Sequence, residues 1–136
     1  MQFLTPLRTE KIGARLVRLT DDVIFLSSRY PGEFVARAGF ETNLASIPRG
    51  LWNIFPPTGE YDIAAVIHDA AYNQFLRTKD GARIHTVKHV ADNLFHEALL
   101  ACGVGKIKAK MMYLGVKAFG KLDKSRTQLE DEPPKE

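Results

Sequence analysis

The sequence predicts an α+β fold, in which a small N-terminal antiparallel β-sheet is followed by three α-helices, the first of them central and buried. Residues 12–38 hold short apolar runs separated by turn residues, as antiparallel strands do. From residue 60 onwards, apolar residues recur at helical spacing and glycines interrupt them. The length of 136 residues suits one domain, placed at residues 1–120, with a flexible polar tail at residues 121–136.

The composition excludes several classes of protein. Hydrophobic residues make up 45% and charged residues 26%, which is typical of a globular domain. No apolar run approaches the roughly 20 residues that cross a bilayer, and residues 1–13 lack the pattern of a secretory signal. The single cysteine, Cys102, cannot form an internal disulfide. A net charge of +3 is too small to indicate nucleic acid as a partner.

The strands are expected in three short segments. Residues 12–19 alternate between apolar and polar, residues 23–27 form an apolar run after an Asp-Asp turn, and residues 33–38 follow a Tyr-Pro-Gly turn. Short turns between strands favour antiparallel pairing of neighbours, so we expect one small sheet, with a meander as its simplest order.

A proline-containing segment at residues 40–57 is too apolar for a solvated loop. We expect it to be a buried connector between the sheet and the helices. Alternatively, it is the wall of a binding site that meets lipid or a protein partner. Its candidate binding residues are then the large side chains Phe40, Trp52 and Phe55.

The three helices are expected at about residues 60–77, 84–102 and 106–119. Gly103 and Gly120 are placed where they would end the second and third helices, because glycine adopts the left-handed conformation of a helix C-terminus without strain. The first helix is apolar on nearly every side, which indicates a buried helix.

Polar residues interrupt this buried helix. His68 and Asp69 lie in its middle and Tyr72 follows one turn after His68. An unpaired buried carboxylate or imidazole costs several kcal/mol, so these groups need partners or a solvent-filled pocket. On the second helix, Asp92 lies near the edge of the apolar face, and antiparallel packing of the two helices would bring it to His68.

An imidazole held by one acid beside a second acid is typical of a metal-assisted hydrolase. Asp92 would fix the tautomer of His68, His68 would take a proton from water, and Asp69 would hold a cation that polarises an ester carbonyl. The alternative is a buried hydrogen-bond network that only orients two helices. A water-accessible cleft above the His68–Asp92 contact would favour the enzyme, whereas an enclosed contact would favour the structural role.

Two further patterns have competing explanations. His85 and His89 are spaced to bind zinc on one helix face, with Asp92 or Asp69 as a third ligand, although exposed histidines of a solvated face have the same spacing. The third helix carries lysines along one edge. That edge suits the phosphates of a membrane surface or a nucleic acid, or it serves solubility alone. These lysines are Lys106, Lys110, Lys117 and Lys121.

Five blocks of the sequence form a recognisable series: FETNLASIPRGLW (residues 40–52), P-P-x-G-x-Y (56–61), AAVIHDAAY (64–72), ADNLFHEAL (91–99) and MYLGVKAFG (112–120). In this order they resemble a family of domains of unknown function that is frequent in tailed bacteriophages and prophages. The resemblance implies a phage or prophage origin and one small domain, but no activity. The family favours Asp where this chain has Asn43. Asn43 can offer a carbonyl oxygen to a metal but no charge.

The motifs H-D-x-x-Y and A-D-x-x-F are also similar to those of the two catalytic helices of secretory phospholipases. This similarity implies that His68 is the base, that Asp69 binds calcium, and that Tyr72 and Asp92 hold the histidine. Asn43 would be an outer metal ligand. The glycine-rich calcium loop of those enzymes has no clear match, since residues 49–52 differ from it and the disulfides are absent.

Two functions from different classes follow from these patterns. The first is a calcium-assisted lipid-ester hydrolase that a phage uses on phospholipid membranes at host entry or lysis. The second is a non-enzymatic phage protein, either a tail or baseplate component that contacts other virion proteins or a binder of a host factor. In both cases we expect synthesis in the host cytoplasm, and in the second, incorporation in the virion.

Overall fold

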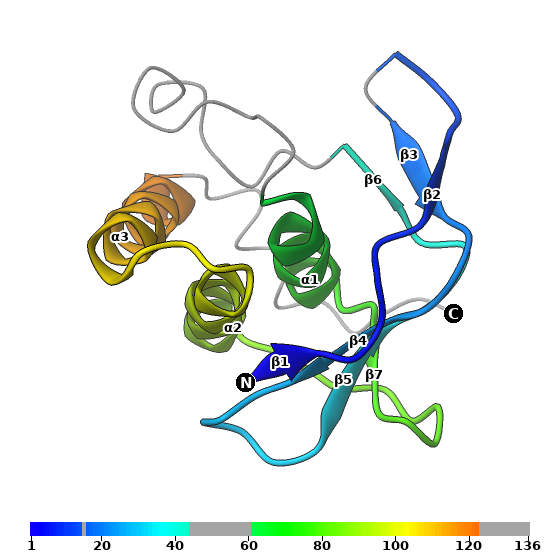
Figure 1. The fold of residues 1–136 in the computed structure, drawn as a ribbon, viewed down its shortest axis with the longest axis horizontal. Coiled ribbons are helices and arrows are strands. Elements are labelled where there is room, and N and C mark those ends of the chain that lie inside the picture. Colours follow the sequence, from blue (N-terminus) through cyan, green and yellow to red (C-terminus); the bar gives the residue numbers. More distant parts are fainter. Residues whose placement is uncertain (15, 44–60, 123–136) are drawn as a thin grey trace.

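The computed structural model describes residues 1–14, 16–43 and 61–122 and has the predicted α+β architecture (Figure 1). Antiparallel strands occupy the N-terminal third, and three helices follow. The strands are β1 (Gln2–Phe3), β2 (Thr9–Lys11), β3 (Val17–Leu19), β4 (Val23–Leu26), β5 (Glu33–Ala36), β6 (Glu41–Thr42) and β7 (Leu76–Arg77). The helices are α1 (Asp62–Tyr72), α2 (Lys88–Ala101) and α3 (Lys106–Leu122).

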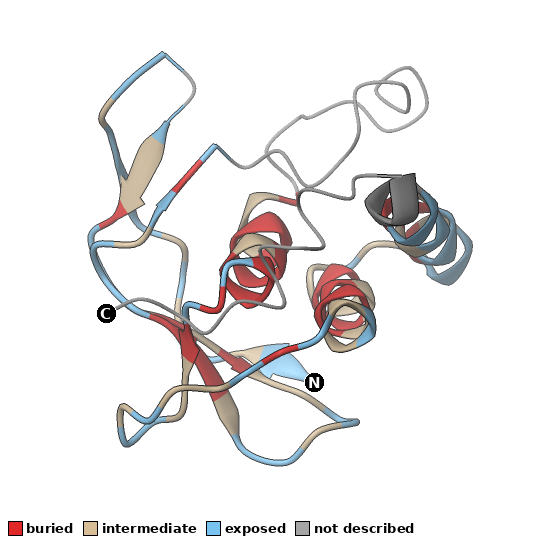
Figure 2. Ribbon diagram, turned by 180° about the vertical axis from the view of Figure 1, so that it is seen from behind, coloured by how far each residue is buried: buried red, intermediate tan, exposed pale blue. Residues whose placement is uncertain are grey.

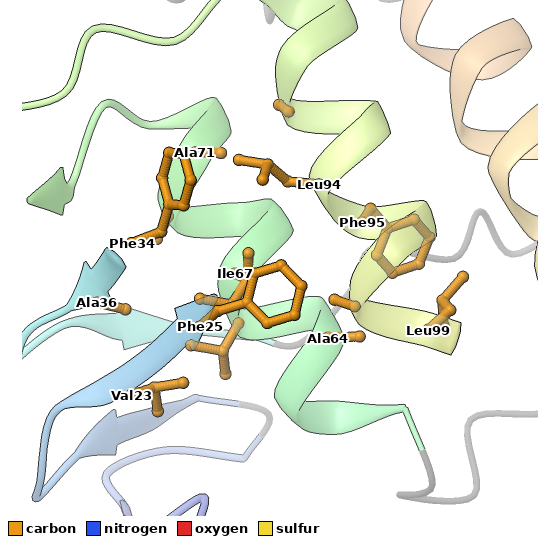
Figure 3. Close-up of a cluster of buried hydrophobic side chains, with 14 of the residues drawn as sticks. Val23, Phe25, Phe34, Ala36, Ala64, Ile67, Ala71, Leu94, Phe95 and Leu99 are labelled. Carbon is orange, nitrogen blue, oxygen red and sulfur yellow. The ribbon is translucent and has the colours of Figure 1, made fainter. Parts of the chain in front are cut away.

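The sheet beneath the helices has the strand order β1-β4-β5-β7, with every neighbouring pair antiparallel. Its centre is the β4–β5 hairpin, where Val23 pairs with Ala36 and Leu26 with Glu33. Strand side chains alternate between the two faces. Val23 and Phe25 therefore point to the same face, where both are fully buried against α1 (Figure 3).

A second, smaller sheet of β2, β3 and β6 departs from the expectation of one sheet. Its outer face is polar, and Arg18 of β3 lies between two carboxylates, with Glu10 at 3.2 Å and Glu41 at 3.0 Å. The expected strand over residues 12–19 is correct only in its second half. The Ile12 and Gly13 N–H groups donate to the Leu16 carbonyl oxygen, which makes a turn rather than a strand.

Helices α1 and α2 lie side by side over the β1-β4-β5-β7 sheet, α1 against β4, β5 and β7 and α2 against β1, and α3 packs on the other side of α2 (Figure 1). Figure 3 shows Ala71 level with Leu94, and Ala64 level with Leu99, as antiparallel α1 and α2 require. The prediction of a central, buried first helix is confirmed (Figure 2). Its buried residues are Ala64, Ala65, Val66, Ile67, His68, Ala70, Ala71 and Tyr72.

The prediction that the first helix continues to residue 77 is wrong, because α1 ends at Tyr72. Gln74 takes a left-handed backbone conformation with φ of 61°. The Phe75 N–H then donates to the Ala70 carbonyl at 2.8 Å, and the Gln74 N–H to the Ala71 carbonyl at 3.3 Å. These are the two bonds of a Schellman motif, formed here without the glycine that usually occupies the left-handed position.

The residues after this turn return to the sheet. The spacing of apolar residues in this segment resembles that of a helix, so the sequence does not reveal the strand. Residues 76–77 form β7 and pair with β5. Residues 84–87 are not helical, so α2 begins four residues later than predicted. Thr86 is buried there, because its backbone N–H and C=O bind the Gln74 side-chain amide at 2.9 and 2.7 Å. Its hydroxyl also donates to the Ala71 carbonyl at 2.5 Å.

The C-terminal end of α3 also differs from the prediction. Gly120 does not end the helix, which continues to Leu122. The tail predicted at residues 121–136 lies outside the described residues from position 123 onwards, as does most of the apolar segment at 40–57. Among the helices that the structure describes, none combines the length and apolarity that a membrane span requires.

The Gln74–Thr86 contact predicts a specific order of stability between two variants. Gln74→Ala removes both side-chain hydrogen bonds and leaves buried Thr86 groups unpaired, so it should lower the free energy of unfolding by about 2–4 kcal/mol. Gln74→Gly removes the same bonds but tolerates the left-handed backbone, and should be less destabilising than Ala by about 0.5–1 kcal/mol. Urea denaturation measures both, and equal stability of the two variants would contradict backbone strain at this position.

Candidate functional site

The contact predicted between the first two helices is present. His68 of α1 and Asp92 of α2 lie with Nε2 and Oδ1 2.9 Å apart. Helical geometry explains the meeting, since both residues lie on the sides of α1 and α2 that face each other. Both are buried, with side chains 4% and 1% exposed.

Aromatic rings fix the orientation of the imidazole. The Tyr72 hydroxyl donates to Asp92 Oδ1 at 3.3 Å, the same oxygen that contacts His68. The His68 ring meets the Tyr72 ring edge to face at 4.6 Å between centroids, and it lies tilted on Phe95 at 4.7 Å. Tyr72 follows His68 by four residues, so both side chains project from the same side of α1. Three of the predicted site residues, His68, Tyr72 and Asp92, therefore form one cluster.

Lys88 is a further member of this cluster that the sequence interpretation missed. Its Nζ lies 2.5 Å from Asp92 Oδ2, one turn earlier on α2, and 3.2 Å from the backbone oxygen of Lys117 on α3. The i, i+4 spacing from Asp92 is a signal that could have identified it. Asp92 thus joins α1 to α2 directly, and its partner Lys88 extends the network to α3.

The electrostatics of the cluster favour an ionised Asp92. Burial by itself would raise the pKa of this carboxyl group. The hydrogen bonds and charge interactions with His68 and Lys88 outweigh burial and hold the pKa of Asp92 below its usual value. An ionised carboxylate only accepts hydrogen bonds, so Nε2 of His68 carries the hydrogen that it shares with Asp92. Nδ1 is then the nitrogen that Asp92 does not hold.

The two predicted metal ligands lie outside this cluster. The Asp69 side chain is half-buried, and its Oδ1 accepts a hydrogen bond from Asn73 Nδ2 at 2.9 Å. Asn43 is exposed, directly after β6. Across residues 1–14, 16–43 and 61–122, no three or more His, Cys, Asp or Glu side chains gather in a way that could hold a metal ion.

His85 and His89 do not share the helix face that was predicted to bind zinc. His85 precedes α2, so it and His89 are not one turn apart on a helix, and both are exposed. Asp92 is instead enclosed with His68. His96 packs on the Tyr113 ring at 5.2 Å, and burial, followed by the charges of Lys110 and Arg29, lowers its pKa.

Of the three predicted binding side chains, only Phe40 lies in the described part of the chain. It is half-buried and packs against Phe75, with ring centroids 5.3 Å apart. The contact joins the residue before β6 to the residue after the α1 turn. Trp52 and Phe55 lie outside the described residues.

A second buried acid, Glu97, also escaped the sequence interpretation. It is 8% exposed, accepts a hydrogen bond from the Ser28 N–H at 2.9 Å and binds the Ser27 hydroxyl. Both serines lie in the turn between β4 and β5. Glu97 therefore attaches α2 to the sheet. The polar position on an apolar helix face was the available signal.

The lowered pKa of Asp92 predicts a pH-dependent stability. Asp92→Asn should lower the free energy of unfolding at pH 7 by about 1–3 kcal/mol, because it disrupts a buried hydrogen-bonded group. A depressed folded-state pKa stabilises the protein above the unfolded value of about 3.9, and this stabilisation is lost as pH falls through the folded pKa. The advantage of the wild type over the variant should therefore shrink as pH falls below about 4.

Urea denaturation between pH 2.5 and 7 measures this difference. Asp80→Asn is the matched control, since this exposed carboxylate lies on the loop after β7 and its loss should change stability by less than about 0.5 kcal/mol. A difference between wild type and Asp92→Asn that does not change with pH would contradict the assignment of Asp92 as an ionised member of the cluster.

Comparison with known proteins places the chain in a family without assigning it an activity. No curated protein and no solved structure matches it. The family model described as "Protein of unknown function (DUF1353)" matches residues 17–116, which include β3 to β7, α1, α2 and most of α3. This region covers more than half of the chain and the whole His68–Asp92 cluster, and the chain therefore belongs to the DUF1353 family.

Proposed function

We propose that this chain is a phage or prophage protein that hydrolyses lipid esters with His68 as general base. The single observation that supports the proposal is the position of the His68 ring, held through Nε2 by Asp92 Oδ1 at 2.9 Å, with Tyr72 bound to the same oxygen. This arrangement matches the roles that the similarity to secretory phospholipases implies for the three residues. A phage would use the activity on the host envelope at entry or lysis.

The chemistry follows from the tautomer that Asp92 selects. In the proposed reaction, His68 would take a proton from a water molecule as the water oxygen attacks the ester carbonyl carbon. The bond between the acyl carbon and the alkoxy oxygen then breaks, and the imidazolium returns its proton to the departing alkoxide. Asp92 stabilises the imidazolium, and Tyr72 positions both groups without touching substrate.

Calcium would supply a positive charge that polarises the ester carbonyl. Asp69 and Asn43 offer the hard oxygen donors that calcium prefers, but they amount to one carboxylate and one amide, and calcium takes about 6–8 oxygens. The remaining ligands would come from other residues, water or substrate. Asn73 donates a hydrogen bond to Asp69 Oδ1 and so orients the carboxylate.

A fluorogenic phospholipid assay with calcium or with a chelator tests the proposal. We expect calcium-dependent turnover by the wild type, and a loss of about 10²–10⁴-fold in His68→Gln, because a positioned general base contributes that much to the rate. His89→Gln is the matched control, since it removes an exposed imidazole from α2 and should retain full activity.

Background turnover by the wild type, equal to that of His68→Gln, would refute the hydrolase. If His68→Gln does not fold, the half-buried Asp69→Asn and the effect of the chelator keep the proposal testable. Asp69→Asn removes a predicted calcium ligand and the chelator removes calcium itself, and neither change alters the His68–Asp92 contact between α1 and α2.

The non-enzymatic phage protein is the second candidate, and a different observation favours it. The His68 and Asp92 side chains are 4% and 1% exposed, and Lys88 occupies the second oxygen of Asp92. This network is enclosed, and the Lys88 ammonium group already binds the Asp92 carboxylate. Such an arrangement suits a role in which these residues only fix the positions of the three helices. The chain would then be a tail or baseplate component, or a binder of a host factor.

Protein content of purified virions tests the structural candidate. A structural component should be present in stoichiometric copies, and its assembly should depend on exposed surfaces rather than on His68. Mass spectrometry of particles that carry wild-type or His68→Gln chains measures both. Absence of the chain from particles would contradict the structural role at the tail or baseplate.

A further inference from the structure

We propose that the outer face of α3 binds the surface of an anionic lipid bilayer. The face consists of two adjacent stripes on one helix, one apolar and one basic. The proposal does not depend on hydrolysis at His68, because a membrane-binding surface is equally useful to a structural protein. Figure 2 shows that the side of α3 turned away from α2 is exposed.

The apolar stripe is formed by Ile107, Met111 and Leu114, which recur at i, i+4 and i+7 and are 79%, 47% and 49% exposed. The opposite face of α3 accounts for its packing, since Ala109, Met112 and Val116 are at most 4% exposed. The outer stripe is therefore not needed for the core. It borders an open hollow of about 700 Å³ lined by Gly105, Lys106, Ile107, Lys108 and Met111.

The basic stripe lies directly beside the apolar one. Every charged residue of α3 is a lysine, and its sequence KIKAKMMYLGVKAFGKL contains five lysines and no acid. Lys106, Lys110 and Lys117 are exposed. Three of the five lysines lie in the first five residues, at the end where the helix dipole is already positive. This placement disfavours the isolated helix and favours an anionic partner.

The combination identifies a lipid surface rather than a second copy of the chain. Two such faces would bring six exposed lysines together, since each carries Lys106, Lys110 and Lys117 and α3 contains no acid as a counter-charge. A bilayer interface receives apolar side chains among its acyl chains and lysines at its phosphates. A helix of 17 residues with this division into two faces lies in the plane of the interface and does not span it.

Sedimentation with vesicles of diether phosphatidylglycerol or diether phosphatidylcholine tests this surface. These lipids contain no acyl ester, so binding is measured in the absence of turnover. We expect binding to the anionic vesicles that weakens with added salt, and little binding to the zwitterionic ones. The double variant Lys106→Gln/Lys110→Gln should lower the partition coefficient about 25-fold, or about fivefold for each lysine. Ile107→Ser/Leu114→Ser should lower it about tenfold or more.

The controls change side chains beside the small sheet, where Leu16, directly before β3, is 37% exposed and Lys11 of β2 is exposed. Leu16→Ser and Lys11→Gln should bind as the wild type does, and so should His68→Gln. Equal binding to both kinds of vesicle, or no loss in the α3 variants, would overturn the proposal. A concentration-dependent dimer that Ile107→Ser/Leu114→Ser disrupts would overturn it in favour of self-association.

Discussion

The structure depends on how one buried carboxylate is neutralised. Asp92 is 1% exposed and receives His68 and Tyr72 from α1, and Lys88 from its own helix. A buried acid without these partners would cost several kcal/mol, so the positions of the helices are constrained by its need for them. Lys88 extends the constraint to α3 through the Lys117 carbonyl oxygen. The packing of all three helices is thereby tied to the charge of a single residue.

The early end of α1 makes this arrangement possible. Because the chain reverses at Gln74, residues 76–77 can pair with β5 before α2 begins. The chain therefore contacts the sheet before the turn, through α1, and again after it, through β7. After β7, Thr86 binds both Gln74 and the Ala71 carbonyl near the end of α1. These bonds fix where α2 begins, and therefore which turn of α2 brings Asp92 next to His68. Backbone conformation at one residue and placement of the site are directly connected.

These features differ in how far the sequence could predict them. The pairing of His68 with Asp92 was predictable, because helical periodicity places polar residues on faces that are otherwise apolar. The turn at Gln74 was not, because no glycine marks it and the residues that follow keep a helical pattern of apolar side chains. The start of α2 was also placed too early, so His85 was expected on the same helix face as His89, although it precedes the helix. Partners at long separation, such as Glu97 with Ser27 and Ser28, leave no periodic signal at all.

The detailed form of the cluster bears on why it exists. Replacing a buried ion pair by apolar residues is often neutral or stabilising, so stability alone does not explain a His-Asp-Tyr-Lys network. Register between helices is one explanation, and a single polar contact is sufficient for that. Here, Tyr72 and His68 share one oxygen of Asp92, and the rings of Tyr72 and Phe95 fix the plane of the imidazole. A fixed ring plane is what the proposed general base at His68 would use, whereas the enclosure of His68 and Asp92 is what a purely structural network would use.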